Sequence, residues 1–147
     1  MTKPSKPRVF LDADVLFAGA ASPSEHGASL LILRLAEITL LEVLTSEQVI
    51  TEAERNLTAK LPQALPAFRH LVSRCLKICP NPKPGDLLPY EGLADPKDLP
   101  ILVAAKQENC LWLVTFNLRH FLPGHSDVEV LKPGDFVLRV RDQLAHI

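Results

Sequence analysis

One apolar run, LWLVT at residues 111–115, constrains the fold of this chain more than any other segment. Its apolar residues follow one another without alternation, which is the pattern of a central parallel strand covered on both faces. Other short apolar runs in the chain alternate with segments of helical spacing. Strands that alternate with helices predict an α/β fold, here a three-layer α/β/α sandwich around a central parallel sheet.

The expected elements follow from this alternation. The sequence predicts strands at residues 8–11, with residues 15–17 continuing the first strand, and at 40–44, 76–80 and 128–131. It predicts helices at residues 27–37, from an N-cap at Ser46 to about Leu57, at 65–76, from Asp95 or Asp98 to about Asn109, and at 134–144. Residues 80–97 hold five of the thirteen prolines and two of the six glycines, so a loop with a role in function is expected there.

The size and composition fit one folded domain over residues 1–147. A chain of this length buries a core without a disulfide or a metal, and a hydrophobic fraction of 47% excludes a disordered chain. The three cysteines include no C-x-x-C pair, which argues against a disulfide framework or a zinc ribbon. No apolar run reaches the roughly 18 residues of a membrane helix, so we expect a cytoplasmic protein that does not engage a membrane.

Acidic residues lie where the predicted strands end and the helices begin. Asp12 directly follows the run RVFL, and an acid after a buried strand must be satisfied by some partner. Thr115 and Asn117 follow the LWLV strand, so they should lie on the same rim of a parallel sheet as Asp12. The other candidate acids lie in or beside predicted helices: Asp14, Glu52, Asp95 and Asp98.

Carboxylates that converge on one site repel one another unless a cation is bound between them. Mg²⁺ and Mn²⁺ favour such oxygen ligands, and a metal held in this way activates water against a phosphodiester. The pattern therefore favours metal-dependent phosphodiester chemistry. For Asp95 and Asp98 a second interpretation stays open, because both lie where a helix begins and either is a candidate for its N-cap.

The formal net charge of −1 gives the chain no general nucleic-acid signature. Any affinity for RNA must therefore come from a local basic patch. Lys97, Arg119 and His120 lie within or beside the acidic motifs, and we expect them to contact phosphates. His120 has a second interpretation, in which the His-Phe pair packs the end of the strand.

Four motifs in series cover nearly the whole chain and together resemble a PIN domain: RVFLDADVLFAGA, SEQVITEAERNL, DPKDLPILVAA and LVTFNLRHF. The subgroup that the chain most resembles is the bacterial single-domain toxins of the VapC kind. The resemblance implies a metal-dependent endoribonuclease that hydrolyses RNA phosphodiester bonds with Mg²⁺ or Mn²⁺. It also implies a homodimer and, as the partner of a toxin, an inhibitory antitoxin protein.

The resemblance also implies roles for individual residues. Asp12, Glu52 and Asp98 match the three catalytic acids of the family. The expected metal ligands are these three residues together with Asp95. Supporting roles are expected for Asp14, Asp95, Thr115 and Asn117.

One departure from the family pattern keeps alternatives open. Many members carry a fourth acid where this chain has Asn117, which brings no charge. A PIN-like module whose catalysis has decayed, and which only binds RNA or a protein, is therefore an alternative. A phosphoacceptor signalling domain is a weaker one, because the positions after LWLVT offer Asn117 and Arg119 but no lysine.

Overall fold

A parallel sheet forms the centre of the protein. The computed structural model describes residues 6–21, 27–37 and 41–145. Within these residues the sheet has five parallel strands in the order β3-β2-β1-β4-β5. The strands are β1 (Arg8–Leu11), β2 (Glu42–Ser46), β3 (Lys77–Cys79), β4 (Trp112–Val114) and β5 (Glu129–Leu131).

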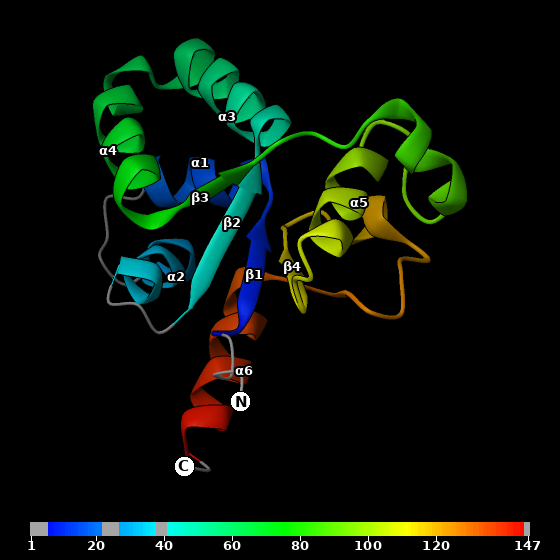
Figure 1. Cartoon of the computed structure of the whole chain (residues 1–147). Helices are drawn as coiled ribbons and strands as arrows, with labels where there is room; N and C mark the ends of the chain where they lie inside the picture. The colour runs from blue at the N-terminus through cyan, green and yellow to red at the C-terminus, as the bar shows by residue number, and fades with distance from the viewer. Residues whose placement is uncertain (1–5, 22–26, 38–40, 146–147) are drawn as a thin grey trace.

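Helices cover both faces of this sheet. They are α1 (Ala13–Ala21), α2 (Ala28–Glu37), α3 (Glu47–Lys60), α4 (Leu65–Cys75), α5 (Leu99–Gln107) and α6 (Pro133–Ala145). Short 3₁₀ helices are η1 (Pro62–Ala64), η2 (Pro84–Tyr90) and η3 (Leu118–Phe121). Figure 1 shows α1, α2 and α4 on one side of the sheet and α5 on the other. The predicted three-layer α/β/α sandwich is confirmed.

The interior strands are apolar at consecutive positions because both of their faces are covered. Val9 and Phe10 of β1, and Leu113 and Val114 of β4, have no exposed surface. The run at residues 111–115 therefore forms an interior strand, as predicted. It lies one place from the centre, which is occupied by β1.

The predicted continuation of the first strand through residues 15–17 is wrong. These residues belong to α1, which begins directly after Asp12. The main-chain oxygen of Asp12 accepts hydrogen bonds from Val15 N at 3.2 Å and Leu16 N at 3.3 Å. The apolar residues of this segment are buried in either conformation, so their composition did not distinguish a strand from a helix.

Other boundaries differ by smaller amounts. β2 begins at Glu42 and not at residue 40, and residues 38–40 lie outside the described part of the chain. Ser46 is the N-cap of α3, as predicted, and accepts a hydrogen bond from Val49 N. The predicted loop at residues 80–97 contains η2, which packs against α5. Among the described helices, none is long and apolar enough to span a bilayer.

Candidate functional site

The carboxyl ends of β1 and β4 bring Asp12 and Thr115 together. Leu11 and Val114 are paired in the sheet, and the next residue along each strand is Asp12 or Thr115. The Thr115 hydroxyl donates a hydrogen bond to Asp12 Oδ2 at 2.8 Å. The amide of Ala13 donates to the other carboxylate oxygen at 2.7 Å. Asp12 is only 7% exposed, so these two bonds supply partners that solvent cannot.

Asp14 lies in the first turn of α1 and is held against the segment that follows β4. Its Oδ2 accepts hydrogen bonds from Phe116 N at 3.0 Å and from Asn117 Nδ2 at 3.1 Å. The Thr115 hydroxyl lies 3.4 Å from the same oxygen. The other oxygen, Oδ1, is buried and accepts no hydrogen bond from the residues that the structure describes. A buried oxygen without a partner fits a site that binds a cation.

Asp98 is buried at the start of α5, beside Asp95 and His120. It occupies the N-cap position, but its side chain makes no capping hydrogen bond. His120 Nδ1 lies 3.2 Å from Asp98 Oδ2, a distance that suits an ion pair, although this oxygen accepts no hydrogen bond. Asp95, Asp98 and His120 each offer one atom that can ligate a metal, and these three atoms lie within 4.8 Å of one another. The side chain of Asp98 therefore does not cap α5, and its carboxylate is available to a cation.

Glu52 approaches the same group of acids from α3. Burial raises its pKa, and so do the charges of Asp12 and Asp98, while Lys97 and Arg55 lower it. Glu52, Lys97 and Asp98 line one pocket of about 500 Å³. The helix after β2 and the helix before β4 thus contribute carboxylates to one opening in the surface.

Nearby cations offset the burial of these acids only in part, because the net shift of each pKa is upward. Burial raises the pKa of Asp12, while the Thr115 hydroxyl partly offsets this effect. Burial and then the charge of Asp12 raise the pKa of Asp14 to about 6. The same two causes raise the pKa of Asp98. Raised pKa values in a cluster of carboxylates, together with buried oxygens that lack partners, fit a site for a divalent cation.

This arrangement only partly matches the metal ligand set expected from the sequence. Asp95 and Asp98 form a close group with His120, whereas Asp12 and Glu52 reach that group through electrostatic interaction. Histidine was expected to contact phosphate or to pack the strand end. His120 lies in η3, six residues after β4 ends, and nothing in the sequence indicates its contact with Asp98.

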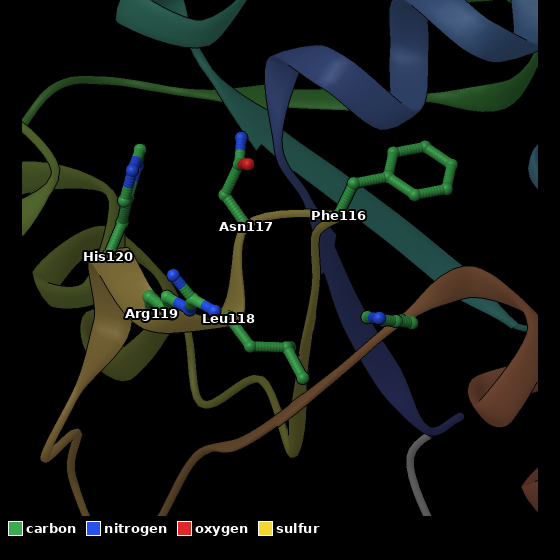
Figure 2. Close-up of a pocket in the computed structure, with 6 residues that line it drawn as sticks. Phe116, Asn117, Leu118, Arg119 and His120 are labelled. Carbon is green, nitrogen blue, oxygen red and sulfur yellow. The ribbon is translucent and has the colours of Figure 1, made fainter.

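A second pocket of about 490 Å³ adjoins the acids on the side of η3. Its lining residues are Phe116, Asn117, Leu118, Arg119, His120 and Lys132. Figure 2 shows Asn117 between the ring of Phe116 and the imidazole of His120. Arg119 and His120 line this pocket and Lys97 lines the first one, so their contact with phosphate stays a prediction. Sequence reasoning missed Phe116 and Lys132, since neither belongs to an acidic or basic cluster in the chain.

Comparisons with known proteins agree with this fold. A family model described as PIN domain matches residues 8–119. No curated protein matches the chain in sequence. The structure is similar to that of VapBC2 from Rickettsia felis bound to a promoter DNA fragment, at 18% identity and a TM-score of 0.64, covering 84% of this chain and 96% of that chain.

Two further solved structures share the fold. PAE2754 from Pyrobaculum aerophilum is 18% identical with a TM-score of 0.64, covering 92% of this chain and 96% of that chain. Mycobacterium tuberculosis VapC20, a sarcin-ricin loop cleaving toxin, is 16% identical with a TM-score of 0.52, covering 71% and 86%. Because the family model matches residues 8–119, which is more than half of the sequence, the chain belongs to the PIN domain family.

Proposed function

We propose that this protein is a divalent-metal-dependent endoribonuclease in which Asp12, Glu52 and Asp98 hold Mg²⁺ or Mn²⁺, assisted by Asp95. The observation that carries the proposal is that burial raises the pKa values of all three catalytic candidates, and that the charge of Asp12 raises those of Glu52 and Asp98 further. A bound divalent cation lowers the pKa of water and neutralises charge on a phosphoryl group. Membership of the PIN domain family supports the same chemistry.

The remaining residues of the site orient these acids. Thr115 fixes the rotamer of Asp12 by its hydrogen bond of 2.8 Å. Asn117 turns its amide nitrogen towards Asp14, so it positions a carboxylate where many family members carry an acid of their own. Asp14 thereby supplies negative charge near the position that Asn117 leaves neutral. This compensation supports an active nuclease over a decayed module.

The substrate is proposed from the charges around the site. Lys97 shares a pocket with Glu52 and Asp98, and Arg119 lies in the adjoining pocket. Cations on two sides of the acids suit a polyanion that passes across the metal site. The similarity to a sarcin-ricin loop cleaving toxin supports RNA as this polyanion. With RNA as its substrate, the protein would act in the cytoplasm.

We propose that the protein is the toxin of a toxin–antitoxin pair. The structure resembles VapBC2, whose crystals contain a DNA fragment from the promoter, and this likeness supports an antitoxin partner for the present chain. We also propose a homodimer. Light scattering of the purified protein, alone and after coexpression with the product of an adjacent gene, tests both assemblies.

The strand order argues against the phosphoacceptor alternative. Signalling domains of that class have the order 2-1-3-4-5, with the third strand beside the first. Here β2 and β4 flank β1, and β3 lies at an edge. A central β1 with α3 and the start of α5 at its carboxyl end supports a site in which Glu52 and Asp98 act together with Asp12.

Replacement of Asp12 tests the proposal directly. Asp12→Asn keeps the shape of the side chain but removes the charge, so cleavage of a fluorescent RNA with Mn²⁺ should fall by at least about 100-fold. Thermal melting should show that the variant remains folded. Full activity in this variant would refute the assignment of Asp12.

A matched pair on α3 tests metal binding. Glu52→Gln should weaken Mn²⁺ binding in calorimetry, because Glu52 is one of the proposed ligands. Glu54→Gln is the control, since Glu54 lies on the same helix and pairs with Arg69 instead. A wild-type protein that binds RNA but no Mn²⁺ would favour the decayed module.

A further inference from the structure

An exposed aromatic ring lies immediately beside the acidic site. Phe116 is 46% exposed, although it directly follows the fully buried Thr115. Its main-chain N–H donates to Asp14 Oδ2 at 3.0 Å, so the backbone of this residue is tied to the acids. The main chain of Phe116 is therefore fixed beside Asp14, and the half-exposed ring extends from it towards solvent.

The pocket around this ring is basic. Arg119, His120 and Lys132 line it together with Phe116. Arg119 and Lys132 form no ion pair with an acidic residue in the part of the chain that the structure describes. An aromatic face with uncompensated cations around it suits a nucleotide, in which a flat base is joined to a phosphate.

The basic pocket and the acidic site share a wall. Asn117 lines the pocket and donates to Asp14, while His120 lines it and lies 3.2 Å from Asp98. The pocket volume of about 490 Å³ falls within the range of small-molecule sites, which suits a single base with its sugar. A ligand in this pocket would thus be separated from the acids only by the side chains of Asn117 and His120.

We propose that this pocket binds one unpaired base of single-stranded RNA, stacked on Phe116, with adjacent phosphates on Arg119 and Lys132. The inference rests on the proposed ribonuclease function and adds to it a subsite that positions the strand. Base stacking on an aromatic ring tolerates any base, because every base has a π face. A base inside a duplex has both of its faces covered, so the subsite selects single strands.

The composition of the pocket favours RNA over a protein as its occupant. Of its lining residues only Phe116 and Leu118 are apolar, and Leu118 is half-buried. A protein partner would require a wider apolar surface than these two side chains provide. Cations that flank a single ring match the alternation of base and phosphate along a strand instead.

Binding of an unstructured, fluorescein-labelled RNA of twelve nucleotides tests the proposal. Anisotropy is measured in EDTA, so that no cleavage occurs. Phe116→Ala should weaken binding by about 5- to 100-fold, and Phe116→Trp should retain it. Leu111→Ala is the matched control, because Leu111 is 53% exposed at the opposite end of the same strand. Binding to duplex RNA should not change in any variant.

Abasic substitution along the same RNA identifies the stacked base. At one position, removal of the base should weaken binding to the wild type by the same factor as Phe116→Ala, and should have no further effect on that variant. Equal RNA affinity of the wild type and Phe116→Ala would overturn the subsite, and would be the result if the ring docked a protein. Cleavage that depends on Asp12 is measured separately, so that failure of the nuclease proposal is distinguished from failure of the subsite.

Discussion

At the scale of single residues, Asp14 shows how burial and a neighbouring charge act together. Its pKa of about 6 is raised first by burial and second by Asp12. Between the ordinary value of about 4 and the folded value, the folded protein holds a proton that the unfolded chain has lost. The free energy of unfolding of the metal-free protein therefore falls as the pH rises through this window.

Asp14→Asn should remove this penalty. Discounted for the solvent that reaches this half-buried side chain, the variant should be more stable than the wild type by about 1 kcal/mol at pH 7. The difference should disappear below about pH 4, where Asp14 is protonated in both folded and unfolded protein. Urea unfolding in EDTA at several pH values measures this dependence. A gain that is independent of pH would show that the charge of Asp14 is not its cause.

At the scale of elements, α6 is joined to the sheet by an aromatic contact. Phe136 of α6 has no exposed surface, and its ring meets that of Trp112 with centroids 5.3 Å apart at an interplanar angle of 65°. Trp112 begins β4, the strand that ends beside Thr115. The last helix thereby supports, from the opposite end, the strand that carries one side of the candidate site.

Phe136→Ala should lower the free energy of unfolding by about 3–5 kcal/mol, because it leaves a cavity against Trp112. Leu138→Ala on the same helix should change it by less than about 0.5 kcal/mol, since Leu138 is 46% exposed. Denaturant titration of both variants provides the comparison. Similar losses in the two variants would contradict the role given to the aromatic pair.

The spacing of apolar residues along the sequence predicts most helices and strands, but not every boundary between them. The helical spacing of apolar residues around Glu52, and the Ser46 cap, fixed α3 because both signals are local. Residues 15–17 were expected in a strand, and the chain instead turns at Asp12 into α1. The turn depends on main-chain bonds to Asp12 and on contacts of α1 with α2 and α3, which a short apolar run does not encode.

At the scale of the whole molecule, net charge gives no attraction to the RNA that we propose as substrate. The formal charge is −1, so nucleic-acid affinity must arise where cations gather. Lys97 lies in the pocket with Glu52, and Arg119 and Lys132 lie in the pocket with Phe116. In the proposed function a divalent cation would offset the repulsion between these acids and phosphate, so RNA affinity should fall with salt and should be higher with Mn²⁺ than in EDTA.

Each of these cations should contribute to the salt dependence of RNA binding. If Lys132 contacts one phosphate, Lys132→Ala should lower the slope of log affinity against log salt by about 0.7, the value for a single strand. Lys60→Ala, an exposed change at the end of α3, should leave the slope unchanged. Anisotropy titrations between low and moderate salt give the slopes. An unchanged slope for Lys132→Ala would remove this residue from the RNA path.

The sequence by itself determined the layered α/β architecture and the candidate catalytic acids, because the spacing of apolar residues and the motifs are both local properties of the chain. Only the tertiary structure decided how those acids are arranged. The Asp98 carboxylate makes no capping hydrogen bond and lies beside His120. Asn117 is hydrogen-bonded to Asp14, and Phe116 lines a basic pocket. These outcomes depend on side chains from separate strands and helices meeting at one rim of the sheet, and sequence spacing does not specify such distances.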